Sequence, residues 1–161
     1  MSMALGIGRM WLRQFGLALM GALLWTGAAQ AAPDAPLPAS VSLAKELAQA
    51  LQRHEPLVVM VSLENCPFCR ISRRSHLNPM WKAGLPIVQV DMRSNAMTED
   101  FAGKSVTHDQ MARRWQTKVA PTLLFIGPGG KEVAERMEGT YLPDFYGPYL
   151  QERLAQARKA L

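Results

Sequence analysis

The residues best suited to chemistry are Cys66 and Cys69, which flank Pro67 and Phe68 and are the two cysteines of the chain. A thiolate attacks a disulfide sulfur, and a second thiol nearby can then attack the resulting mixed disulfide and release the partner. The Cys-x-x-Cys spacing therefore predicts a dithiol–disulfide cycle with Cys66 as nucleophile and Cys69 as resolving thiol.

The sequence before the pair predicts that Cys66 opens a helix. Residues 57–63 form an apolar run that indicates a buried strand, and the cysteines follow after a short polar step. The first turn of a helix has unpaired N–H groups and partial positive charge, which together stabilise a thiolate. Pro67 suits that turn, because its φ is already helical and its missing N–H would have been unpaired.

The side chains that follow set the expected electrostatics. Phe68 places an apolar ring between the sulfurs and supplies no cation for the thiolate. Arg70 can add positive field, whereas Arg73 and Arg74 are expected on a solvated helix face.

Glu64 precedes the nucleophile by two residues. Its negative charge would oppose thiolate formation, or its carboxylate could help to move a proton. We therefore expect the pKa of Cys66 to be lowered, but by less than in the strongest oxidants with this motif.

Other uses of the cysteines have less support. Zinc needs about four ligands, and the candidates to complete such a set are scattered at His54, His76 and His108. Covalent haem attachment would need a histidine at position 70, which is arginine. A purely structural disulfide stays open, although so small a loop would restrain the unfolded chain little. We predict no metal and no cofactor.

Composition predicts one domain without nucleic-acid partners. The 161 residues can enclose one core, and the net charge of +5 comes without a Lys/Arg block interleaved with aromatic residues. No separate dimerisation domain is evident, so we expect a monomer.

The N-terminus predicts export. Arg9 and Arg13 precede an uncharged apolar run over residues 15–28, and Ala-Gln-Ala follows at 29–31. This is the pattern of a cleavable signal peptide over residues 1–31, with an uncleaved anchor as the alternative. Export predicts a periplasmic location, where disulfides persist.

The remaining patterns predict an α/β fold. Residues 32–40 are expected to form an extended leader and residues 41–161 the domain. The predicted elements, in order, are a helix from Ser40 or Ser42 to about His54, a strand over 57–63, a helix over 66–77 broken or kinked at Asn78-Pro79, a strand over 86–92, an inserted loop over 93–106 with at most a short helical turn, a helix capped by Thr107 or Asp109, a strand over 122–126, a tight turn over 127–130, a strand over 131–137 and a last helix to about Lys159. Pro143 suits the first turn of this last helix, and Gly147-Pro148 should either kink it or delay its start. This order predicts a mixed sheet of about four strands with helices on both faces.

Two motifs resemble the thioredoxin family. The strand–Cys-x-x-Cys–helix unit is one, and the stretch Val119–Phe125, which resembles the family's cis-proline loop before a Gly-Pro-Gly-Gly-Lys hairpin, is the other. The resemblance implies a cis Pro121 beside Cys66, and pairing of the Ala120 backbone with an extended substrate segment. It also implies that Gly139 leaves room near the site.

Within this family, the export signal, the insert and the ending at 141–149 are most similar to periplasmic thioredoxins associated with bacterial sulfur oxidation. Two positions depart from cytosolic thioredoxins, which carry a buried Asp and a Trp where this chain has Met60 and Asn65. The Pro-Phe dipeptide is closer to glutaredoxins. These departures leave the redox direction open.

The expected function is a periplasmic thiol–disulfide oxidoreductase that reduces disulfides of partner proteins. A membrane-bound thiol reductant would supply its electrons. Two alternatives stay open: a periplasmic oxidase that oxidises dithiol proteins at the same cysteines, and a non-catalytic thioredoxin-fold module that binds partners along the Ala120–Pro121 edge.

Overall fold

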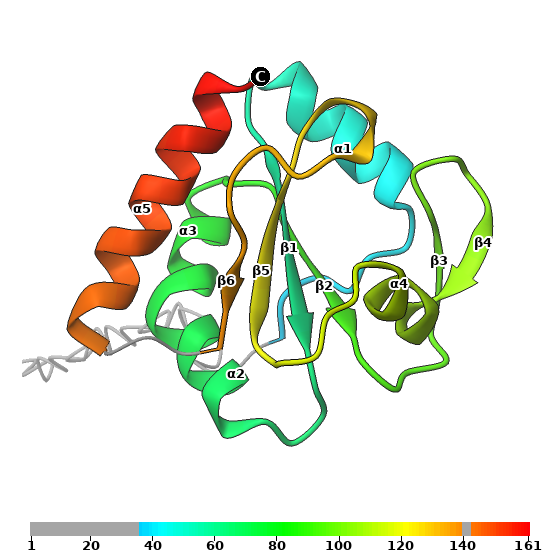
Figure 1. The fold of residues 1–161 in the computed structure, drawn as a ribbon, viewed down its shortest axis with the longest axis horizontal. Coiled ribbons are helices and arrows are strands. Elements are labelled where there is room, and N and C mark those ends of the chain that lie inside the picture. The colour runs from blue at the N-terminus through cyan, green and yellow to red at the C-terminus, as the bar shows by residue number, and fades with distance from the viewer. Residues whose placement is uncertain (1–35, 140–142) are drawn as a thin grey trace, which may run out of the picture. The chain divides into compact units, whose positions relative to one another are not determined.

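The structure is a computed structural model, and it describes residues 36–139 and 143–161. Its centre is a four-stranded sheet with strand order β2-β1-β5-β6 (Figure 1). Strand β1 (Leu57–Ser62) is parallel to β2 (Ile87–Asp91) and antiparallel to β5 (Thr122–Ile126), which pairs with β6 (Met137–Glu138). The predicted mixed sheet is confirmed.

Helices cover both faces of this sheet, as predicted. One face packs against α1 (Leu43–Gln52) and α4 (His108–Arg114), and the other against α2 (Pro67–Ser72), α3 (Asn78–Lys82) and α5 (Pro143–Lys159) (Figure 1). We call these the α1/α4 face and the α2/α5 face.

The alternation of side chains along β1 assigns residues to the two cores. Val58 and Met60 join the cluster on the α2/α5 face together with Cys69, while Val59 and Val61 join the cluster on the α1/α4 face. All six residues of β1 are buried, as expected for a central strand covered on both sides.

The helix that follows the cysteines is longer than predicted. It does not break at Asn78-Pro79 but continues through a π turn over Arg73–Leu77 and then through α3. The N–H of Asn78 donates to the carbonyl of Arg73, five residues back. This wider turn shifts the hydrogen-bond register just before Pro79, which has no N–H to contribute, so the chain stays helical.

The insert over residues 93–106 is not an irregular loop. Strand β3 (Met97–Glu99) pairs antiparallel with β4 (Ser105–Thr107), and together they form a separate two-stranded sheet. The carboxylate of Asp100 accepts from the N–H groups of Ala102 and Lys104, both at 2.9 Å, and this closes the hairpin loop. Because a single aspartate makes these bonds, the sequence shows no regular alternation of apolar residues here, and the hairpin could not be predicted from it.

The predicted caps and the C-terminal hairpin have mixed outcomes. Ser42 caps α1 and Thr107 caps α4, so one predicted candidate is confirmed at each helix. The strand predicted over 131–137 is wrong in extent, because β6 comprises Met137–Glu138 and the segment before it meets β5 through a bridge between Ile126 and Glu132.

The last helix, α5, runs through Pro148 without interruption from its start at Pro143. Its start is therefore not delayed by Gly147-Pro148. Pro148 is the sixth residue of the helix, so its missing N–H removes a single intrahelical hydrogen bond.

The described part of the leader lies along the edge of the sheet. Ser40 N–H donates to Gln89 O, and Gln89 N–H donates to Pro38 O, both at 2.8 Å. Leu37 and Ser40 are buried. These residues therefore cover the middle of the outer edge of β2.

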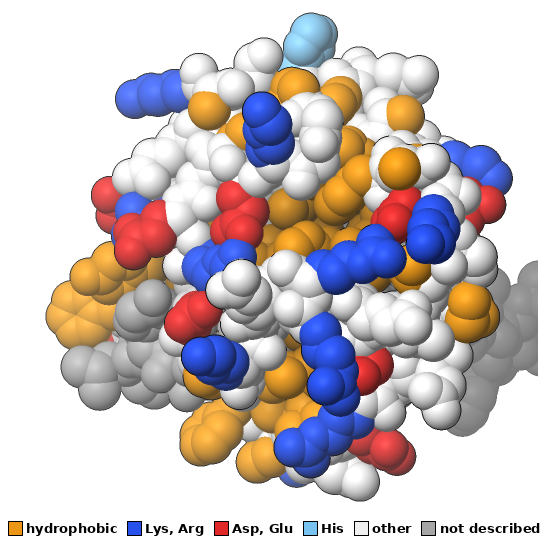
Figure 2. Space-filling model, turned by 45° about the vertical axis from the view of Figure 1, so that its right-hand side comes forward, with side chains coloured by type: hydrophobic (Ala, Val, Ile, Leu, Met, Phe, Trp, Pro, Cys, Tyr) orange, Lys and Arg blue, Asp and Glu red, His pale blue; other side chains and the backbone are white. Residues whose placement is uncertain are grey.

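The predicted signal peptide over residues 1–31 lies outside the described residues. Within 36–139 and 143–161, no helix combines the length and the apolar character that a membrane crossing needs. Figure 2 shows basic, acidic and apolar side chains interspersed on one side of the molecule.

Candidate active site

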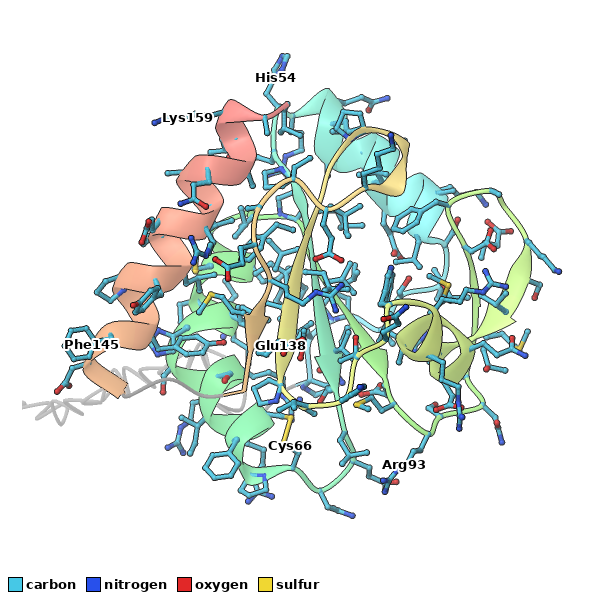
Figure 3. All side chains as sticks on the ribbon, in the orientation of Figure 1. His54, Cys66, Arg93, Glu138, Phe145 and Lys159 are labelled. Atoms are coloured by element: carbon cyan, nitrogen blue, oxygen red, sulfur yellow. A yellow bond between two sulfur atoms is a disulfide. The ribbon has the colours of Figure 1, made fainter. Side chains whose placement is uncertain are left out.

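Cys66 and Cys69 form a disulfide at the start of α2, with their Cα atoms 5.2 Å apart. Cys66 is the N-cap residue of the helix, and the N–H of Cys69 donates to its Sγ at 3.1 Å. Cys66 is half-buried, whereas Cys69 is fully buried in the cluster on the α2/α5 face. The two sulfurs thus differ sharply in access. Figure 3 shows Cys66 at the end of the sheet where α2 begins.

The residues around the pair explain this placement. Asn65 has a φ of 58°, a left-handed conformation that asparagine tolerates better than most residues, and it turns the chain from β1 into the helix. Pro67 is the first helical residue and is exposed. The side chain of Phe68 is directed outward, with an exposed fraction of 54%.

The loop before β5 lies directly against the nucleophile candidate. The Ala120–Pro121 peptide bond is cis, and the Ala120 carbonyl oxygen lies 3.8 Å from Cys66 Sγ. Pro121 is buried and Ala120 half-buried. The structure therefore brings together the cysteine motif and the proline motif, which are more than 50 residues apart in the sequence.

Gly139 supports this loop in a different way from the one the resemblance implied. Its N–H donates to the Pro121 carbonyl at 2.7 Å, and its φ is 73°. A Cβ there would meet Val119 Cγ1 at an ordinary 3.7 Å. The backbone conformation, rather than a lack of room, is what calls for glycine.

The two charged candidates beside the cysteines are both exposed. Glu64 lines a cleft next to Asn65, and among the described residues no hydrogen bond joins its carboxylate to either cysteine. The backbone N–H of Arg70 donates to the Cys66 carbonyl at 3.2 Å, and its side chain is exposed. Both roles stay predictions.

Arg73 was expected in solvent, and this expectation is wrong. It is half-buried and donates to Ser62 Oγ at 3.0 Å and to Gln89 Oε1 at 3.1 Å, while the exposed Arg74 fits the expectation. Gln89 in turn donates to Asp91 Oδ1 at 2.7 Å. We call Arg73, Ser62, Gln89 and Asp91 the Arg73 network.

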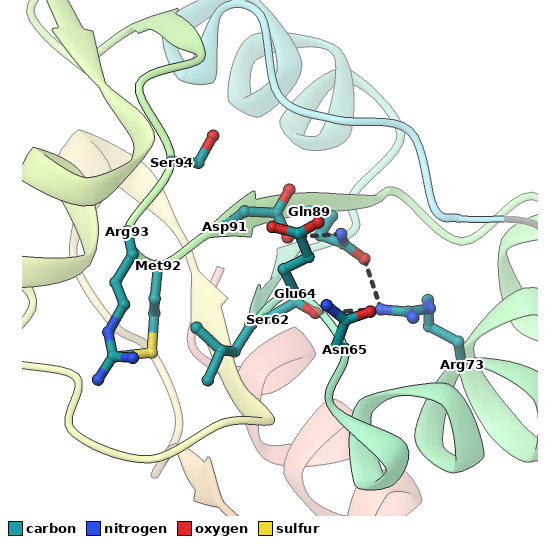
Figure 4. Close-up of a pocket in the computed structure, with 10 residues that line it drawn as sticks. Ser62, Glu64, Asn65, Arg73, Gln89, Asp91, Met92, Arg93 and Ser94 are labelled. Carbon is teal, nitrogen blue, oxygen red and sulfur yellow. Dashed lines mark hydrogen bonds between the residues drawn. The ribbon is translucent and has the colours of Figure 1, made fainter.

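This network forms the wall of a cleft of about 640 Å³ beside the cysteine motif (Figure 4). The cleft is lined by Ser62, Leu63, Glu64, Asn65, Arg73, Gln89, Asp91, Met92, Arg93 and Ser94. Sequence reasoning missed the network. Its one signal was Gln89, a polar residue in the middle of an apolar strand.

His108 and His76 have structural surroundings, whereas His54 is exposed. His108 is buried, with Nδ1 accepting from the N–H of Asp91 at 3.2 Å and Nε2 at 2.9 Å from the Ser40 carbonyl. His76 stacks on Tyr146, and partial burial lowers the pKa of its imidazole. Within the described residues, no three His, Cys, Asp or Glu side chains converge as a metal site would require.

A mixed four-stranded sheet between helices, with Cys-x-x-Cys at a helix start and a proline loop beside it, defines a thioredoxin fold with a redox-capable cysteine pair. The family model of a thioredoxin-like domain matches residues 43–153. The chain belongs to this thioredoxin-like family.

Several solved structures are similar to this chain. A DsbH oxidoreductase is 21% identical, with a TM-score of 0.50, over 78% of this chain and 88% of that one. The periplasmic thioredoxin SoxS from Paracoccus pantotrophus is 20% identical, with a TM-score of 0.43, over 64% of this chain and 99% of that one.

The C-terminal domain of DsbD from Neisseria meningitidis is 17% identical, with a TM-score of 0.49, over 71% of this chain and 99% of that one. No match was found among curated proteins. Identities this low show the fold alone, so the narrower resemblance to sulfur-oxidation thioredoxins stays a prediction.

Proposed function

We propose that this chain is an exported thiol–disulfide oxidoreductase that reduces disulfides of partner proteins. The observation that carries the proposal is the asymmetry of the pair, with Cys66 half-buried at a helix start and Cys69 fully buried behind it. An accessible sulfur can attack a partner, and a shielded one can reach only the mixed disulfide that forms next to it.

In the proposed cycle, the Cys66 thiolate attacks a partner disulfide and one partner sulfur leaves as a thiolate. Cys69 then attacks Cys66, the second partner sulfur leaves, and the Cys66–Cys69 disulfide forms. The partner gains two electrons and two protons, and the pair loses them. A membrane-bound thiol reductant returns the chain to the dithiol state.

The surface around Cys66 supports a polypeptide partner. Phe68, Ile71 and Val119 are large apolar side chains exposed by 54%, 49% and 44%, in the segments that flank the cysteine pair and the proline loop. A partner could cover these side chains while its extended backbone pairs with Ala120.

Insulin reduction tests the proposed activity. The wild-type domain should accelerate the reduction of insulin by dithiothreitol, whereas Cys66→Ser should show no acceleration although it folds normally. An equal rate for wild type and Cys66→Ser would contradict the proposed activity and favour the non-catalytic binding module.

The equilibrium potential in a glutathione buffer tests the direction. A reductase should lie near about −270 mV, and an oxidase near about −120 mV. The periplasmic location has its own test: mass spectrometry of the exported protein should show a mature N-terminus after Ala31, and a retained segment would favour the anchor.

A further inference from the structure

The resolving step of the proposed cycle poses a problem at Cys69. This thiol must lose a proton before it can attack, yet the side chain is fully buried among apolar neighbours that include Met60. An apolar environment disfavours the thiolate, and a methionine side chain offers no site for the departing proton.

The sheet supplies polar groups one step farther along the same face. Met60 and Ser62 lie two residues apart on β1, so both are directed to the α2/α5 face. In the parallel register Met60 pairs with Gln89 and Ser62 with Asp91. Ser62, Gln89 and Asp91 therefore share the face that the cysteine helix covers.

Arg73 connects this polar patch to the cysteine helix. It follows Cys69 by four residues, a spacing that places the two side chains next to each other on a helix. Its guanidinium donates to Ser62 and Gln89, and Gln89 donates to Asp91 (Figure 4). A permanent positive charge is thus placed one helical turn from the resolving thiol and linked through Gln89 to a carboxylate.

Asp91 has the access that a proton acceptor needs. Its side chain is half-buried and lines the cleft of about 640 Å³, which is large enough to hold water. Glu64 and Arg93 line the same cleft, and His108 accepts the backbone N–H of Asp91. Among the described residues, these and Arg73 are the titratable or charged groups that line the cleft or bond to Asp91.

We propose that the Arg73 network handles the proton of Cys69. Arg73 favours the Cys69 thiolate, and Asp91 receives the thiol proton through water in the cleft and passes it to solvent. In this step the Cys69–Cys66 bond forms, the bond between Cys66 and the partner sulfur breaks, and the partner leaves as a thiolate. Arg73 and Gln89 are positioning residues. The inference rests on the proposed thiol–disulfide cycle.

The two cysteines can be followed separately with the aromatic disulfide dithiobis(nitrobenzoate). Attack by Cys66 of the reduced protein releases one nitrothiobenzoate, and attack by Cys69 on the mixed disulfide releases a second. Stopped-flow absorbance from about pH 5 to 9 therefore gives a first phase for the nucleophile and a second phase for the resolving thiol.

Asp91→Asn should slow the second phase at least about tenfold at pH 7 and leave the first unchanged. The deficit should shrink as the pH approaches the ordinary ionisation range of a thiol, about 8.5. Removing a negative charge would by itself favour the thiolate, so a slower second phase identifies lost proton transfer.

Arg73→Met should also slow the second phase, and Arg73→Lys should restore part of the rate.

The matched control is Arg74→Met, which removes an exposed arginine from the next position and should change neither phase. A second phase that is unchanged in Asp91→Asn and Arg73→Met, or two phases slowed equally, would overturn the inference while leaving the cycle intact. If the wild type shows no separate second phase and no insulin reduction, the proposed function itself fails.

Discussion

The two faces of the sheet contain different kinds of side chains at the end where the cysteines lie. The α1/α4 face is apolar along β1, where Val59 and Val61 are fully buried, and its polar side chain in β5, Thr122, donates its hydroxyl to the carbonyl of Val119 in the adjacent loop. The α2/α5 face changes from the apolar Met60 to Ser62, Gln89 and Asp91 under the cysteine helix. We infer that the first face contributes stability alone and that the second also serves the chemistry.

The largest effect should come from removing the nucleophile. Cys66→Ser should lower insulin reduction at least about 100-fold, because the remaining thiol, Cys69, is fully buried. The unfolding free energy of the reduced protein should change little, since this side chain is half-buried at a helix cap. Turnover and urea unfolding under reducing conditions measure the two quantities.

A core truncation on the α1/α4 face should give the opposite pattern. Leu124 is fully buried, so Leu124→Ala should lower the unfolding free energy by about 2–5 kcal/mol through lost burial and a residual cavity. Activity per folded molecule should stay near that of the wild type. A loss of turnover in fully folded Leu124→Ala protein would show that both faces take part in the chemistry.

Gly139→Ala should have a smaller effect that reaches the site. An alanine at a φ of 73° costs about 1 kcal/mol, and relaxation would disturb the bond from this N–H to Pro121. We expect a raised KM for protein disulfides. Gly129→Ala is the matched control, because its φ is 69° and a Cβ there meets nothing within 4 Å. It should show a similar loss of stability with an unchanged KM.

The smallest effect should be an acid-dependent one at the inserted hairpin. A hydrogen bond from Arg114, with further bonds from the N–H groups of Lys104 and Ala102, lowers the pKa of Asp100 below its ordinary 3.8. A lowered pKa means that the stabilisation is complete above 3.8 and is lost as the pH falls through the folded-state value.

Asp100→Asn should therefore be slightly less stable than wild type at pH 7, and the difference should vanish in strong acid. Urea unfolding at several pH values measures it, with thiol chemistry as the control that should not move. A stability difference that grows on acidification would have the wrong sign for this carboxylate.

The sequence predicted well what depends on regular patterns. Apolar runs located β1, β2 and β5, capping residues located α1 and α4, and the cysteine and proline motifs located the two sides of the site. These features are continuous apolar runs or residues with a fixed place at a helix end, so local sequence determines them.

The sequence failed where distant groups decide the outcome. The helix passes Pro79 because a π turn shifts its register, and the insert folds into a hairpin because Asp100 binds its own loop. Arg73 resembled any exposed arginine, since its partners Ser62 and Gln89 come from two other elements. Hydrogen bonds between side chains of distant elements produce no local pattern in the sequence.

The central claim is that Cys66 attacks partner disulfides and Cys69 resolves the product. Its most direct test is to purify Cys69→Ser and Cys66→Ser after exposure to disulfide-containing proteins and to identify covalent complexes by mass spectrometry. The account predicts that Cys69→Ser accumulates complexes through Cys66 that dithiothreitol releases, and that Cys66→Ser accumulates none. Complexes through Cys69, or equal trapping by both variants, would contradict it.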